Sequence, residues 1–244
     1  MKKYLLICLA FVFTVCCKKS DNSNSNSTTI LADGTINYGI NINGGLHVLN
    51  IKSENGSFPS ITLHKAFVWM GSELNSQSAG VVTCNDSTLQ QNASLFNMYF
   101  FFGQNLFNVD SNNIAWKVAG NAATGIAAFN YVDSQPWPKN FDFFYSATTV
   151  NPNNDFTITF PALPANVSGI IFSISGVDDD KSYGFMGNTK TSITFSSSDL
   201  KSVIKNGNLI TISAQPVIIS EATIAGKRYN FLKSYLVSKL FPVQ

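Results

Sequence analysis

Charged residues, histidine and arginine are all scarce in this chain. Charged residues make up 12% of the 244 residues, about half the share of a typical soluble domain. Arginine occurs once, as Arg228, and histidine twice, as His47 and His64. The histidine spacing fits no zinc signature, and no nucleophile elbow, phosphate loop or dinucleotide-binding pattern occurs. The sequence therefore predicts a non-enzymatic protein without a cofactor. A hydrolase that pairs one histidine with carboxylates is the alternative.

Long apolar runs are also missing. The longest one follows Lys2 and Lys3 and covers residues 4–15, which is shorter than the roughly 20 residues that a membrane-spanning helix needs. A cationic start followed by a short apolar run is typical of a signal peptide.

The end of that run, 13–17 (Phe-Thr-Val-Cys-Cys), resembles a bacterial lipobox, with Thr14 where the family prefers an aliphatic residue. The segment 17–21 (Cys-Lys-Lys-Ser-Asp) is similar to the start of many Bacteroidetes lipoproteins. The resemblance implies that residues 1–16 are removed, that Cys17 carries lipid, and that the protein is held on the bacterial membrane, with the outer membrane expected. An ordinary secretory signal with a chance cysteine pair is the alternative. Residues 17–29 are rich in Asn and Ser and are predicted to form a disordered tether.

Removal of the signal peptide changes the charge balance and the supply of cysteine. Lys2 and Lys3 leave with it, so 14 basic residues then face 14 acidic ones. A neutral chain lacks the clustered positive charge that nucleic acid requires. With Cys17 lipidated, Cys84 is the remaining thiol and no intramolecular disulfide can form. We interpret Cys84 as a buried, inert thiol. A nucleophile or an intermolecular bridge is the alternative.

Short β-favouring runs separated by Gly, Asn, Asp and Pro dominate after residue 30. Their spacing, and the alternation in Phe156–Phe160, predict an all-β fold built as an antiparallel β-sandwich. One short helical turn is expected near 197–205, and Asn43-Gly44-Gly45 is typical of a hairpin turn. Strands are expected at 46–51, 65–70, 80–84, 97–102, 114–118, 156–160, 169–175, 192–195, 209–213, 216–219 and 228–232.

A small, flexible stretch at 120–125 suggests a boundary between a β domain or sub-domain at 30–122 and a second β domain at 123–244. Three further segments are similar to surface lipoproteins of Bacteroidetes: Ala79–Asn85, Trp116–Gly120, and Ser192–Ser196 leading into Asp199–Leu200. This resemblance implies an immunoglobulin-like sandwich in the second half. It brings no catalytic or binding residue with it.

Two groups of residues are candidates for a site. Asp178, Asp179 and Asp180 form an acidic run that we interpret as a solvated turn after the strand expected at 169–175; a calcium site built from their hard oxygen ligands is the alternative. Trp137 lies between two prolines, and Phe141 and Tyr145 follow it. Exposed rings of this kind can bind a sugar or a protein, whereas buried ones pack under a loop. The expected function is a surface-anchored binding or assembly module for a glycan or a surface protein.

Overall fold

The computed structural model describes residues 27–39, 41–55, 58–72, 75–104, 106–107, 111–138, 141–177, 179–205 and 207–244. These residues are mostly β-strand with one short α-helix, α2 (Ser197–Val203), and their sheets are mostly antiparallel, as the sequence predicts. Among them, no helix is long and apolar enough to cross a membrane. The expected signal peptide, Cys17 and most of the expected tether lie outside the described residues.

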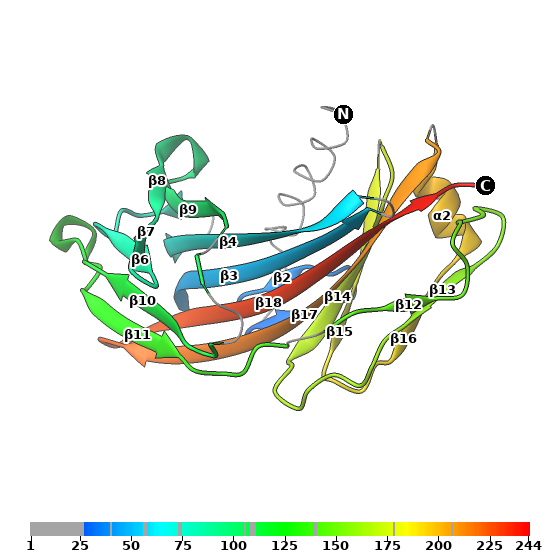
Figure 1. Ribbon diagram of the computed structural model, residues 1–244. Coiled ribbons are helices and arrows are strands. Elements are labelled where there is room, and N and C mark those ends of the chain that lie inside the picture. The colour runs from blue at the N-terminus through cyan, green and yellow to red at the C-terminus, as the bar shows by residue number, and fades with distance from the viewer. Residues whose placement is uncertain are drawn as a thin grey trace.

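A central sheet of nine strands, counted over the described residues, runs the length of the molecule (Figure 1). Its last two strands in the chain, β17 and β18, lie beside its long early strands, and β18 pairs with β3 in parallel. All other strand pairs among the described residues of this sheet are antiparallel. Its order is β15 (Asp180–Met186), β14 (Gly169–Ser175), β17 (Leu209–Ile224), β18 (Lys227–Pro242), β3 (Ile42–Asn55), β4 (Phe58–Ser72), β9 (Met98–Gly103) and β8 (Gln90–Asn92), with β5 (Asn75–Ser76) on β4.

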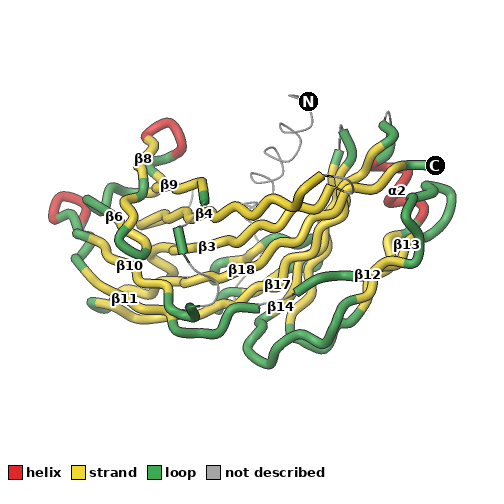
Figure 2. Tube along the Cα trace, viewed as in Figure 1, coloured by secondary structure: helices red, strands yellow, loops and turns green. Residues whose placement is uncertain are grey.

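Two smaller sheets flank the central sheet at its two ends, and loops connect them across the middle (Figures 1 and 2). The first flanking sheet contains β6 (Val82–Cys84), β7 (Ser87–Thr88), β10 (Ile114–Val118) and β11 (Phe129–Asp133). The second contains β12 (Phe144–Tyr145), β13 (Phe156–Thr159) and β16 (Ser192–Phe195). A short hairpin of β1 (Thr29–Ile30) and β2 (Ile36–Asn37), and the 3-10 turns Ala93–Leu95 and Ala122–Thr124, complete the elements.

The two faces of the central sheet have different coverings. Odd-numbered residues of β18 from Tyr229 to Phe241 point to one face, which we call the front face, because side chains alternate along a strand. Both flanking sheets pack on this face. Phe231 lies in the same core as Trp116 of the first flanking sheet, and Val237 lies in the same core as Ile158 of the second. The β1–β2 hairpin packs on the opposite, back face, against residues such as Leu232.

Most of the expected strands are confirmed, and those at 114–118, 169–175 and 192–195 have the predicted bounds. The two runs expected at 209–213 and 216–219 form one strand, β17. Its pairing with β18 keeps one register on both sides of Pro216, although no pair is recorded for Gln215 and Pro216. Proline has no N–H to donate, so an interruption of the ladder at this point has a simple cause.

The hairpin turn expected at Asn43-Gly44-Gly45 is wrong, because these residues lie inside β3. The physical reason is packing. A side chain at Gly45 would meet Trp69 Nε1 at 2.5 Å and His47 Nε2 at 2.8 Å, so the glycine lets both rings lie against the backbone. A tight turn of the chain lies instead at Ala225-Gly226, between β17 and β18. Both residues there have positive φ, 50° and 75°, as in a type I′ turn.

Strands from both sides of the expected 122/123 boundary share sheets and a core. β10 pairs with β11 across the boundary, and Phe129 lies in the core that contains Leu46. Residues 141–243 supply the second core. The strands on the two sides of residue 122 are thus hydrogen-bonded to each other, and β18 contributes to both cores, with Phe231 in the first and Val237 in the second.

The segment between the two flanking sheets crosses the front face, and two lysines of β18 hold it there. We call its described parts, 133–138 and 141–143, the strap. Lys233 Nζ donates to the backbone carbonyls of Asn112, Asp133 and Gln135 at 2.6, 2.8 and 2.8 Å and lies 3.3 Å from the Asp133 carboxylate. The side chains of Lys233 and Asp133 are 1% and 2% exposed. All three ammonium protons are therefore used inside the protein.

We expect Lys233→Met to destabilise the fold severely. Methionine keeps most of the side-chain volume but leaves the Asp133 carboxylate buried without its cation and three carbonyls without a donor. Loss of one partner of a buried pair costs about 3–5 kcal/mol. Urea unfolding of the wild type and the variant measures this loss. Lys205→Met is the matched control, since Lys205 is half-exposed beside Asp179, and it should change little. Equal small effects of both changes would contradict the role of Lys233.

Candidate functional site

Polar side chains gather at the middle of the front face, between the two flanking sheets. Register places them side by side, because Tyr235 pairs with Asn50 and Lys239 pairs with Glu54. In a chain with few charges, this is an unusual concentration. We call the set the central strip, and it consists of Asn50, Lys52 and Glu54 of β3, Tyr235 and Lys239 of β18, and Asp142 of the strap.

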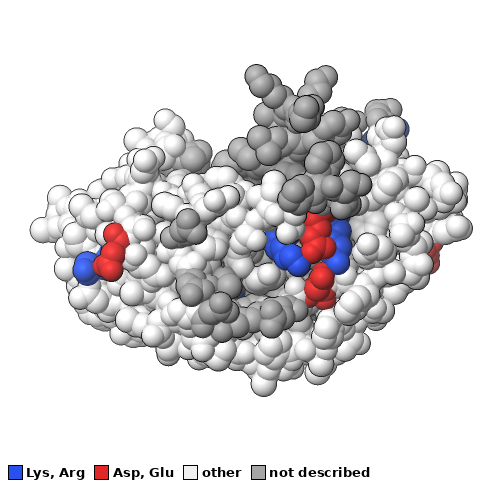
Figure 3. All heavy atoms as spheres, in the orientation of Figure 1, with Lys and Arg blue, Asp and Glu red and all other residues white. Residues whose placement is uncertain are grey.

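The charged members of the central strip form one ion network. Lys52 lies 2.6 Å from Glu54, and Lys239 lies 2.7 Å from Asp142 and 3.5 Å from Glu54. Lys239 also donates to the carbonyl of Phe143 at 2.8 Å. Figure 3 shows charged atoms grouped at this part of the front face, and a second, smaller group at the first flanking sheet. Two ammonium groups face two carboxylates, so the strip carries no net charge.

The network is accessible from solvent at three of its four groups. The side chains of Lys52, Glu54 and Asp142 are 30%, 31% and 35% exposed, whereas Lys239 is 12% exposed. The hydrogen bond to Glu54 raises the pKa of Lys52, and burial raises the pKa of Tyr235. The strip thus presents ammonium donors and carboxylate acceptors that are already paired with each other.

Asn50 and His64 extend the strip toward the first flanking sheet. The two residues are register partners in the β3–β4 pair. His64 Nδ1 accepts the backbone N–H groups of Leu106 and Phe107 at 3.1 and 3.3 Å, and burial lowers its pKa. Asn50 is 2% exposed, and its side-chain oxygen has no hydrogen-bond partner among the described residues. His64 therefore has a structural task, whereas Asn50 holds an unused acceptor.

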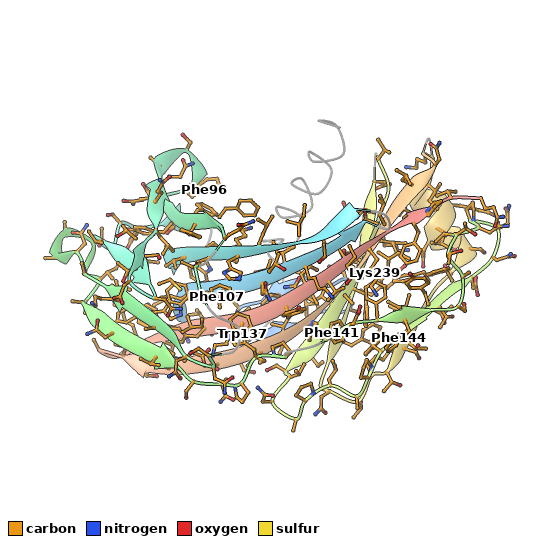
Figure 4. All side chains as sticks on the ribbon, viewed as in Figure 1. Phe96, Phe107, Trp137, Phe141, Phe144 and Lys239 are labelled. Atoms are coloured by element: carbon orange, nitrogen blue, oxygen red, sulfur yellow. The ribbon has the colours of Figure 1, made fainter. Side chains whose placement is uncertain are left out.

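The three aromatic candidates from the sequence lie in different surroundings, and two of them, Trp137 and Phe141, are labelled in Figure 4. Trp137 is 3% exposed and stacks on Phe107 at 4.9 Å, and Phe107 stacks in turn on His64 at 4.1 Å. Phe141 is 7% exposed and packs in the second core. Tyr145 is 41% exposed, and Lys239 Nζ lies 5.5 Å from its ring centre. Of the three rings, Tyr145 is the one that solvent reaches, and it adjoins the central strip.

The described part of the acidic run lies at the start of the edge strand β15, whereas the central strip lies mainly on β3 and β18. Asp178 lies outside the described residues. Asp179 pairs with Lys205 at 3.1 Å, and this contact lowers its pKa. Asp180 begins β15. Among the described residues, no group of three or more His, Cys, Asp or Glu side chains is placed to hold a metal ion.

His47 and Cys84 are both buried. His47 is 3% exposed on the back face, and Tyr38 and Phe67 pack against its ring. Burial, with the nearby charge of Lys65 as a smaller cause, lowers the pKa of His47 to about 3. Cys84 is fully buried, and burial raises its pKa to about 12, so its predicted burial is confirmed.

Sequence reasoning missed the lysines that organise this region. Phe231, Val237 and Phe241 alternate along β18 and mark its apolar face, and Lys233 and Lys239 occupy positions on that same face. A lysine at an apolar-face position signals a buried cation with internal partners. That signal was present in the sequence, but its partners Asp133, Asp142 and Glu54 could not be read from it.

We expect the free energy of unfolding to decrease as the pH is lowered, because His47 is buried in its neutral form. In the unfolded chain its pKa is near 6.5, and in the folded protein it is about 3. Between these values the unfolded state binds a proton that the folded state does not. Stability from this group is therefore complete above pH 6.5 and is lost as pH falls toward 3, by about 1.4 kcal/mol per pH unit.

Urea unfolding of the wild type and of His47→Gln, from about pH 8 to about pH 4, tests this. The free-energy difference between them should be constant above pH 7 and should shift in favour of the variant below pH 6.5. The comparison cancels the carboxylates and His64, which both proteins share. A difference that stays constant over the whole range would contradict the assignment.

Comparison with protein-family models and with curated proteins finds no match to this chain. The case for its function therefore depends on the geometry of the central strip and on the features of its amino terminus.

Proposed function

We propose that this protein is a lipid-anchored protein of the bacterial cell surface, held at the outer membrane through Cys17, and that it is a non-catalytic binding module. The single observation that carries the binding role is the central strip. A chain with 12% charged residues places two ammonium groups and two carboxylates, three of them about one-third exposed, on one face of its main sheet. The ligand is a glycan or a surface protein, and the front face contacts it.

Two further features support this proposal. His47 lies beneath Tyr38 on the back face, and His64 accepts two backbone N–H groups on the front face. Each histidine thus has structural contacts, and the two lie on opposite faces. The lipobox resemblance at 13–17 and the polar segment 17–29 support an anchored protein with a spacer.

For the second half of the chain we propose an immunoglobulin-like β-sandwich. Its support is that two layers enclose the second core. Ile158 and Phe195 come from the second flanking sheet, whereas Phe172, Ile212 and Val237 come from the central sheet. Such modules commonly present binding surfaces on a rigid β scaffold.

We expect Cys17→Ser to release the protein from the membrane. The change removes the thiol that would carry lipid and leaves the rest of the chain intact. Several acyl chains hold a protein firmly, whereas a chain without lipid has no comparable anchor. Fractionation of cells, with detection of the protein in the membrane and soluble fractions, measures the change. Cys16→Ser is the matched control and should leave the protein in the membrane. Membrane association that survives Cys17→Ser would contradict the anchor.

We expect the front face to be the surface that contacts other molecules on the cell. A photo-reactive amino acid at Thr62, which is exposed and pairs with Lys52 in the β3–β4 register, should form covalent adducts in cells that express the protein. The same probe at Lys117, which is 63% exposed on the first flanking sheet, should not. Gel shift and mass spectrometry detect the adducts.

The central strip itself is tested by Lys52→Gln/Glu54→Gln, which removes two opposite charges and keeps the net charge. We expect fewer adducts at Thr62 in this variant. Lys117→Gln/Asp86→Asn removes an exposed pair elsewhere and serves as the control. Adducts at Lys117 in preference to Thr62, or equal adducts in both variants, would defeat the proposal.

A further inference from the structure

We propose that the ligand of the central strip is a neutral polysaccharide, with Tyr145 as the ring on which a sugar stacks and Asn50 as a buried acceptor for a sugar hydroxyl. This inference rests on the proposed binding function and names its ligand class. Three observations carry it, namely the balanced charge of the strip, the exposure of Tyr145 beside it, and the unused oxygen of Asn50.

The charge balance selects a neutral ligand. The strip holds Lys52 and Lys239 against Glu54 and Asp142, at separations of 2.6–3.5 Å. A polyanion needs an excess of positive groups, which the described residues of the strip do not offer. A hydroxyl group is both donor and acceptor, so it can donate to a carboxylate and accept from an ammonium in the same site. A surface that mixes both groups in equal number suits a ligand rich in hydroxyls.

Tyr145 supplies the apolar contact that such a ligand also needs. Its ring is 41% exposed and is fixed edge-on against Phe241, with ring centres 4.8 Å apart. Lys239 Nζ lies 5.5 Å from the ring centre and 2.7 Å from Asp142. A flat ring and a carboxylate therefore border the same ammonium. Small-molecule sites combine apolar contact with a few convergent polar groups in this way.

Asn50 lies at the end of the strip that is directed toward the first flanking sheet. Its side chain is 2% exposed, and its oxygen has no hydrogen-bond partner within the part of the chain that the structure describes. Asn50 lies two residues from Lys52 on the same face of β3. A buried acceptor without a partner costs free energy that a ligand or water hydroxyl can recover. Tyr235, its register partner on β18, adds a phenol hydroxyl group to the strip.

The experiment uses the full chain in detergent and soluble laminarin, xylan, mannan and dextran, with alginate as an anionic comparison. Affinity electrophoresis identifies the polysaccharide that is bound, and titration calorimetry gives its dissociation constant. We expect at least one neutral polysaccharide to bind, with an affinity that changes by less than about twofold as salt is raised, since few ions are released. Binding of alginate alone, weakened steeply by salt, would overturn the proposal.

Single substitutions test which aromatic ring contacts the polysaccharide. Tyr145→Ala should weaken binding by about tenfold or more, and Tyr145→Phe, which keeps the ring, should bind like the wild type. Phe144→Ala is the matched control, because Phe144 is the adjacent ring, more exposed at 61%, and alternation turns it away from Tyr145. Equal losses for Phe144→Ala and Tyr145→Ala would overturn the role of Tyr145.

Asn50→Leu separates binding from stability. Removal of an unpartnered buried oxygen should leave the melting temperature unchanged or higher, whereas affinity should fall several-fold. Asn230→Leu is the control on the back face, where Asn230 is also fully buried and unpartnered; it should not alter affinity. If no neutral polysaccharide binds but Thr62 still forms protein adducts, the glycan proposal fails and the binding function stands. If neither is observed, both fail.

Discussion

Two ammonium groups on the apolar face of one strand are the constraint on which the arrangement of this protein depends. Lys233 and Lys239 lie on the front face of β18, where Phe231 and Val237 show that the surroundings are a core. A buried ammonium must be paired and fully hydrogen-bonded. Both lysines meet that demand through backbone carbonyls and carboxylates of the strap. The strap cannot leave the sheet without leaving a charge and several carbonyls unsatisfied.

The same constraint creates the candidate site. Lys239 draws Asp142 to the edge of the central strip, and Tyr145 follows three residues later with Lys239 near its ring. At the other end, Trp137 lies on Phe107, whose ring covers His64. The strap thus covers the front face beside the first flanking sheet, whereas Tyr145, on β12 of the second flanking sheet, remains exposed. The geometry that stabilises the connection between the two cores also decides which aromatic ring is available to a ligand.

The mostly β, largely antiparallel character of the chain and most strand positions could be predicted from the sequence, because alternation in segments such as Phe156–Phe160 reports one buried face directly. Three features could not. The parallel pairing of β18 with β3 joins residues about 185 positions apart, such as Lys239 and Glu54, and local patterns carry no information about such partners. Gly44-Gly45 has the composition of a turn but is needed where two rings approach the backbone. Trp137 stands between prolines, which indicates a loop but does not say that the loop is pinned against a core.

The electrostatics of the central strip decide how a ligand can gain binding energy there. An ionic group must displace one member of a pair such as Lys52–Glu54, and it then exchanges one ion pair for another with little net gain. A hydroxyl can bond to a paired carboxylate or ammonium without breaking the pair, because each of these groups has further acceptor or donor positions. Hydrogen bonds to charged groups contribute about 1.5–3 kcal/mol each. A ligand with many hydroxyls and one apolar ring face therefore gains more from this surface than a charged ligand does, which is the physical basis for preferring a neutral glycan over an ionic partner.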